Sequence, residues 1–109
     1  MDQGHERRKL KRYKAHVPVE FRSPALRGAG EITNLSKSGL FIRARLLPLP
    51  GDELTLTIRP GTPAAFDVRG TVCWNTDQLS SASASPGFGI RLPTPTPDFS
   101  RFFEEMLLR

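Results

Sequence analysis

The sequence predicts an all-β domain of six short strands followed by one amphipathic helix. Apolar residues recur with period two in several short runs, which is the pattern of half-buried strands. Gly, Pro, Ser and Asn separate these runs and indicate turns. Beyond residue 92 the apolar spacing changes to the period of a helix. A chain of 109 residues has room for one such domain.

The strands are placed by the apolar alternation and by the turns between them. They are expected at residues 17–21, 31–34, 39–44, 54–58, 66–74 and 87–92. Because Pro18 cannot donate a ladder hydrogen bond, we expect the first strand at a sheet edge, or Pro18 at that strand's start. Residues 23–30 are expected to form a turn. In the fifth strand the alternation places Trp74 on the apolar face and Cys73 on the opposite face.

Residues 93–109 predict a Pro-rich linker and an amphipathic helix. Apolar side chains fall at i, i+3, i+4, i+7 and i+8, namely Phe99, Phe102, Phe103, Met106 and Leu107. Thr96 is the expected N-cap and Pro97 the first helical residue. An isolated helix of this length is marginal in water, so its phenylalanines must pack on something. The open end of a barrel is the expected surface, and a partner protein or a second subunit is the alternative.

Most of the net charge of +5 lies at the N-terminus. Residues 1–14 hold six basic and two acidic side chains, or +4, whereas residues 15–109 carry +1. With only Leu10 and Tyr13 to bury, residues 1–14 are expected to form a flexible basic arm, and residues 15–92 the β-domain. Such an arm indicates an anionic partner, whether nucleic acid, nucleotide or membrane surface, and a solvated tail is the alternative.

The sequence offers little that catalysis requires. The histidines, His5 and His16, have no neighbouring nucleophile, no Cys or His spacing suggests a metal site, and no Gly-rich loop precedes the helix. We therefore expect no enzymatic activity, no metal and no cofactor. Cys73 is the only cysteine, the first residues are too charged for a secretory signal, and no apolar run could span a membrane. We expect a cytoplasmic protein without membrane insertion.

Two motifs flank the first strand and could bind a ligand. Arg8 and Arg12 are four residues apart, and guanidinium groups bind phosphate oxygens and guanine edges in bidentate fashion. Asn34, Ser36 and Gly39 form an Asn-x-Ser-x-x-Gly loop that offers short polar groups and a position of close approach. Ordinary turn chemistry explains the second motif equally well, and a solvated tail explains the first.

Together and in this order, the two motifs resemble the PilZ domain family. The family has an Arg-x-x-x-Arg stretch just before the first strand and an Asp/Asn-x-Ser-x-x-Gly motif after it. The resemblance covers roughly residues 6 to 107. It extends to Glu6-Arg7-Arg8 before the first motif, Tyr13 after Arg12, GLFIRA from Gly39, PGDELTL before the fourth strand, and GFGIRL near the end.

The resemblance implies a six-stranded antiparallel β-barrel with a C-terminal helix, a bacterial setting, and cyclic di-GMP as the ligand. It implies that Arg8 and Arg12 bind guanine and phosphate, that Asn34 and Ser36 make polar contacts to guanine or the arm, and that Gly39 is the position of close approach. We expect Gly39 to meet the ligand or to have a positive φ.

Arg7 is expected to be a further ligand contact, because an arginine before the motif can stack on a guanine plane. The resemblance associates such a residue with an intercalated pair, so two nucleotides are expected per chain. The arm is expected to order itself on binding and to signal to an unidentified downstream protein. The alternatives are a nucleic-acid-binding module that uses the basic arm, and a ligand-free PilZ-type adaptor that acts through the terminal helix.

Overall fold

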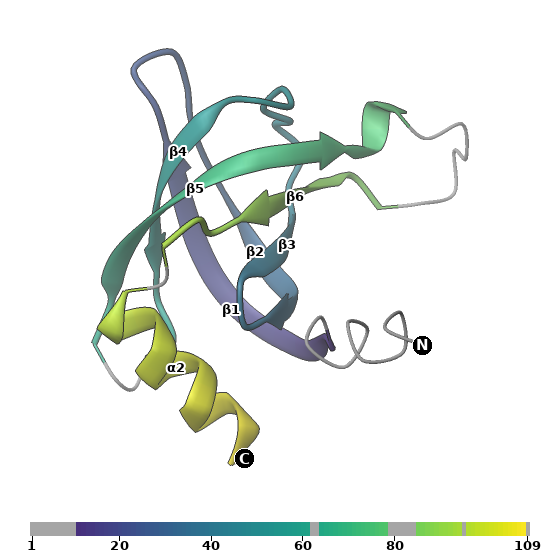
Figure 1. Ribbon diagram of the computed structural model, residues 1–109. Helices are drawn as coiled ribbons and strands as arrows, with labels where there is room; N and C mark the ends of the chain where they lie inside the picture. Colours follow the sequence, from purple (N-terminus) through teal and green to yellow (C-terminus); the bar gives the residue numbers. More distant parts are fainter. Residues whose placement is uncertain (1–10, 62–63, 79–84, 95, 109) are drawn as a thin grey trace.

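Six antiparallel strands close into a barrel in the order β1-β2-β3-β6-β5-β4, and one helix follows (Figure 1). The computed structural model describes residues 11–61, 64–78, 85–94 and 96–108. The elements are β1 (Tyr13–Arg22), β2 (Arg27–Ser36), β3 (Gly39–Arg43), β4 (Glu53–Ile58), β5 (Phe66–Asn75), the 3-10 turn η1 (Thr76–Gln78), β6 (Gly87–Arg91) and α2 (Pro97–Leu107). The predicted fold class, an all-β barrel of six strands with a C-terminal helix, is confirmed.

β1 is longer than expected and is not an edge strand. It begins at Tyr13, so two residues assigned to the arm belong to the barrel. The closed barrel gives β1 a neighbour on each side, β2 and β4. Pro18 is tolerated because pairing with β4 begins one residue later, at Val19. The Pro18 carbonyl still accepts a hydrogen bond of 2.9 Å from the Arg59 amide, just beyond the end of β4.

β2 also exceeds its predicted length, because it begins at Arg27 rather than at residue 31. The expected turn over residues 23–30 is therefore wrong, and the actual turn is closed by a 2.8 Å hydrogen bond from the Ser23 amide to the Leu26 carbonyl. This part of the strand shows no apolar periodicity, because two of its residues are glycines. Gly28 is needed there, since a Cβ would lie 2.6 Å from the ring of Phe21.

The core fills the barrel with side chains from all six strands. The largest fully buried residues of the strands are Phe21, Phe88, Ile32, Leu35, Leu40, Ile42, Leu54, Leu56, Ile58 and Val19. Phe21 and Phe88 meet edge to face across the barrel, with ring centroids 5.0 Å apart. Because these buried apolar side chains of the described strands occupy the barrel interior, we expect a binding site on the outside of the barrel.

α2 covers one open end of the barrel, and the β1–β2 hairpin projects at the other (Figure 1). Phe99 and Phe102 are buried in the core, and the ring centroids of Phe102 and of Phe66 on β5 are 5.6 Å apart. The predicted cap is confirmed, because the Thr96 hydroxyl accepts a 3.2 Å hydrogen bond from the Phe99 amide. The apolar face of the helix thus packs on its own barrel, as expected.

Candidate functional site

The turn between β2 and β3 presents the second motif at the surface. Ser36 and Gly39 are paired across this turn, and the hydroxyl of Ser36, a residue only 2 % exposed, donates to the Gly39 carbonyl at 3.4 Å. A register irregularity between Ile32 and Asn34 interrupts the β2–β3 ladder three residue pairs before the turn. Bulges of this kind redirect a side chain. Asn34 and Ser36 both contact the same arginine, Arg12.

Arg12 brings the two motifs together although they are 22 to 24 residues apart in sequence. Its Nε donates to Asn34 Oδ1 at 2.9 Å, and its Nη1 lies 3.5 Å from Ser36 Oγ. The guanidinium group remains exposed to solvent. Among the described residues its remaining N–H groups make no hydrogen bond, so they are available to an acceptor on a ligand. The other arginines of the predicted site, Arg7 and Arg8, lie outside the described residues.

Gly39 has a structural role that the sequence analysis did not predict. Of the described residues, only Gly51 and Gly61 have a positive φ, so that part of the expectation is wrong. A Cβ at Gly39 would lie 2.7 Å from the carbonyl oxygen of Ile90 on β6. Glycine is therefore required for the close approach of β3 to β6, whether or not a ligand also approaches there.

A surface pocket of about 360 Å³ adjoins these residues. It is lined by Arg12, Ser36, Ser38, Gly39, Cys73, Trp74, Gly89, Ile90 and Arg91. Two arginines line this pocket, Arg91 from β6 and Arg12 from the residue before β1, and among the described residues that line it none is acidic. The pocket therefore has the charge and the donors that an anionic ligand with acceptor edges requires.

Trp74 lies in this pocket because β5 is irregular. The β5–β6 register shifts between Val72 and Trp74, so the alternation reverses and Asn75, rather than Trp74, points into the barrel. The expectation that Trp74 lies on the buried face is thus wrong, and its side chain is 38 % exposed. Cys73 is an exposed strand residue, as predicted.

The tryptophan ring is held in place by β6 and β3. Trp74 stacks on Phe41 with centroids 5.4 Å apart and an interplanar angle of 26°. Both rings lie over β6 glycines, since a Cβ at Gly89 would collide with Trp74 and one at Gly87 with Phe41. The small residues of the GFG segment thus leave room for a flat aromatic surface. Such a surface can stack on a purine.

Sequence reasoning missed Trp74 and Arg91 as candidates for the site. Arg91 pairs with Gly39 in the β3–β6 ladder and with Thr71 in the β5–β6 ladder, so it stands beside the motif loop. The only available signal was the GFGIRL segment, in which glycines precede the arginine. The β-bulge that exposes Trp74 cannot be recognised from the spacing of apolar residues in the sequence.

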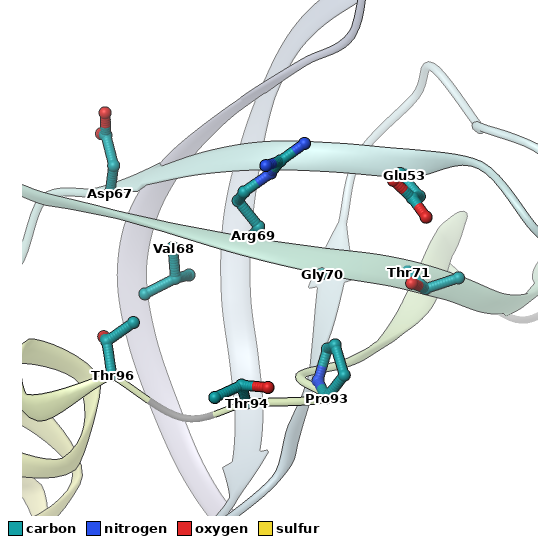
Figure 2. A pocket seen from close by; sticks show the side chains of 9 residues that line it. All are labelled: Glu53, Asp67, Val68, Arg69, Gly70, Thr71, Pro93, Thr94 and Thr96. Carbon is teal, nitrogen blue, oxygen red and sulfur yellow. The ribbon is translucent and has the colours of Figure 1, made fainter.

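A second pocket, of about 480 Å³, lies between β5 and the linker that precedes α2 (Figure 2). Glu53 and Asp67 border it on the barrel, together with Arg69. Asp67 also accepts hydrogen bonds from Thr57 at 2.7 Å and Arg22 at 3.3 Å. Because carboxylates stand at this pocket, the smaller pocket beside Arg12 is the better site for an anion.

Other chemistry finds no support in the part of the chain that the structure describes. No group of three or more His, Cys, Asp or Glu side chains is placed to hold a metal ion there. His16 is exposed, and its Nδ1 lies 3.5 Å from Glu31 Oε2. Within the same residues, no helix is both long and apolar enough to cross a membrane.

Comparison with known proteins agrees with the geometry. The profile of the PilZ domain matches residues 6–108. No curated protein matches the chain significantly. Among solved structures, the inhibitor of motility MotI/DgrA of Bacillus subtilis is similar at 14 % identity with a TM-score of 0.66 over 90 % of this chain, which spans 50 % of that protein. This likeness shows the fold, and the profile match covers nearly the whole sequence. The chain therefore belongs to the PilZ domain family.

Proposed function

We propose that the protein is a cytoplasmic bacterial receptor for cyclic di-GMP whose N-terminal arm closes over the nucleotide and which signals to a partner protein without catalysing a reaction. PilZ domains are binding and adaptor modules. The observation that carries the proposal is the convergence of Arg12, Asn34 and Ser36 beside a pocket with an aromatic wall.

The chemistry of the site matches guanine and phosphate. A guanidinium group donates in bidentate fashion to guanine O6 and N7 or to two phosphate oxygens. The Asn34 contact holds Arg12 in position before the ligand arrives, so less side-chain entropy is lost on binding. Adenine carries a donor where guanine carries O6, so the same arginine selects against cyclic di-AMP.

The size of the pocket supports a role for the arm. Pockets for small ligands measure roughly 300 to 1,000 Å³, and the one beside Arg12 is near the lower limit at about 360 Å³. A cyclic dinucleotide seated there remains partly uncovered. We propose that Arg7 and Arg8 cover it, with Arg8 on phosphate or guanine and Arg7 stacked between bases, and that two nucleotides bind per chain.

Residues 11–13 support a way for nucleotide binding at the arm to affect α2. Tyr13 is adjacent to Arg12, and its ring lies edge-on to that of Phe103 on α2, with centroids 5.8 Å apart. Lys11 Nζ lies 5.5 Å from the centroid of the same tyrosine ring. A rearrangement of residues 11–12 on binding would therefore change the surroundings of α2, where Leu107 and Leu108 are exposed.

The proposal is tested by calorimetric titration of Arg12→Ala with cyclic di-GMP at physiological salt. We expect affinity to fall by about 1.5–3 kcal/mol or more, since hydrogen bonds to a charged group are lost. Arg101→Ala is the matched control, because it removes the same charge from an exposed position on α2 and should bind normally.

Unchanged affinity in Arg12→Ala would exclude the proposed site. A loss of binding that is equal for cyclic di-GMP and single-stranded DNA, and steep with salt, would instead favour the nucleic-acid module. No binding of any nucleotide by the unaltered protein would favour the ligand-free adaptor.

A further inference from the structure

The barrel is closed, but two of its long strands extend beyond their neighbours. β2 and β5 have ten residues each, whereas β3 and β6 have five. β2 pairs with β3 only from Glu31 onward, and β5 pairs with β6 only from Thr71 onward. Among the described residues, no strand pairs with β2 residues 27–30 or β5 residues 66–70 on these sides. Unpaired edges of this kind can accept a further strand.

The two open edges differ in their surroundings. Beside β5, the linker residues Thr94 and Thr96 border the gap (Figure 2). Both acidic and basic side chains line the β5 edge, namely Glu53, Asp67 and Arg69. The charge of these side chains therefore favours neither an anionic nor a cationic partner. The β2 edge lies at the other end of the barrel, beside the projecting β1–β2 hairpin (Figure 1).

Along residues 27–30 of β2, the backbone N–H and C=O groups that do not bond to β1 point toward the open edge of the strand. The Pro18 carbonyl bonds toward β4, so its partner Glu31 on β2 directs its own N–H and C=O away from β1. Bonding direction alternates along a strand, and Arg27 and Ala29 therefore face the same side as Glu31. Both residues are exposed. The edge thus offers donors and acceptors at alternate positions.

The cleft beside this edge is basic. It measures about 540 Å³ and is lined by Arg27, Arg43 and Arg45, and Ser85 is the only other polar side chain among the described residues that line it. Arg43 is paired with Glu31 at 2.7 Å. Within the described part of the chain, Arg27 and Arg45 make no ion pair or side-chain hydrogen bond. Two guanidinium groups are therefore available for an anionic partner.

Apolar side chains adjoin the arginines. Leu46 lines the cleft and is 45 % exposed, and Leu49 on the same loop is 65 % exposed. A cleft that combines a strand edge, free arginines and exposed leucines matches a peptide with alternating acidic and apolar side chains. A nucleic acid supplies phosphate acceptors along its backbone, but its N–H donors lie on the bases and do not alternate with acceptors along that backbone, as the peptide groups of an extended peptide do.

We propose that the open edge of β2, residues 27–30, binds an extended acidic segment of a partner protein by strand addition, with Arg27 and Arg45 pairing with its carboxylates. This surface lies some seven residues along β2 from Ser36, roughly 20 Å at the rise of a strand. It is therefore separate from the nucleotide site, and the proposal does not rest on the proposed ligand.

The test is an NMR titration of the ¹⁵N-labelled protein without nucleotide, using a capped eight-residue peptide that alternates valine and glutamate. We expect shifts at the amides of Arg27 and Ala29 and slower exchange of the Ala29 amide. Two peptides serve as controls: one replaces glutamate by lysine, and one carries N-methyl groups at alternate residues, which removes the N–H donors. Both should bind at least about tenfold more weakly.

A pair of double variants tests the role of the arginines. Arg27→Glu with Arg45→Glu should weaken binding of the glutamate peptide by about tenfold or more. Arg69→Glu with Arg101→Glu makes the same change in net charge at exposed positions elsewhere and should leave binding within about twofold. No shift at Arg27 and Ala29, equal shifts with the lysine peptide, or shifts produced only by an oligonucleotide would each overturn the proposal.

Discussion

Replacing Gly39 by alanine should destabilise the barrel before any ligand is added. A Cβ at this position would lie 2.7 Å from the Ile90 carbonyl oxygen, whereas ordinary contact begins at 3.4 Å, so β3 and β6 must separate by about 0.7 Å. The nearby hydrogen bond from the Leu92 amide to the Ser38 carbonyl, now 2.8 Å, would lengthen with them. Overpacking costs about 1–3 kcal/mol and a lost hydrogen bond about 1 kcal/mol, so we expect a loss of about 2–4 kcal/mol.

Urea unfolding followed by the fluorescence of Trp74, the only tryptophan, measures this loss. The same change should lower Tm by roughly 8–30 °C in a domain of this size. Lys37→Ala, an exposed change in the same turn, should stay within about 0.5 kcal/mol of the unaltered protein. An unchanged unfolding midpoint in Gly39→Ala would refute the packing argument. If that variant were stable yet failed to bind nucleotide, the role of Gly39 would be ligand approach instead.

Two further predictions concern the nucleotide. Trp74→Leu should weaken binding of cyclic di-GMP by about 1–3 kcal/mol, because base stacking is lost, while Leu108→Ala, an exposed apolar change outside the pocket, should bind normally; calorimetry that finds equal affinity for the Trp74 variant would remove the tryptophan from the site. Amide exchange of residues 9–13, measured by mass spectrometry, should slow sharply when ligand neutralises the charge of the arm, and an arm already protected without ligand would contradict coupled folding.

The fold was predictable because local signals agreed with one another. Each predicted strand exists, since period-two alternation reports a half-buried strand wherever apolar residues are present. The helix was placed by Thr96 and Pro97, whose cap chemistry acts locally. The start of β2 was not predicted, because Gly28 and Gly30 carry no apolar side chain. They are required instead by neighbours distant in sequence, Phe21 and Ala44.

The candidate site was only partly predictable for a related reason. Arg12, Asn34 and Ser36 were singled out by motif, and the structure brings them into contact. Trp74 was assigned to the wrong face, because a bulge reverses the alternation without any change in composition. Arg91 was missed because its position beside Gly39 is a consequence of strand order, which the local pattern does not contain.

The central claim, that this barrel binds cyclic di-GMP at the Arg12 site, is tested most directly by calorimetric titration of the complete chain at physiological salt. We expect saturation at two nucleotides per chain, a favourable enthalpy opposed by ordering entropy, and no comparable heat with cyclic di-AMP. Saturation at one nucleotide would contradict the proposal that two nucleotides bind per chain with Arg7 stacked between their bases. The absence of binding, or equal binding of both cyclic dinucleotides, would contradict the central claim itself.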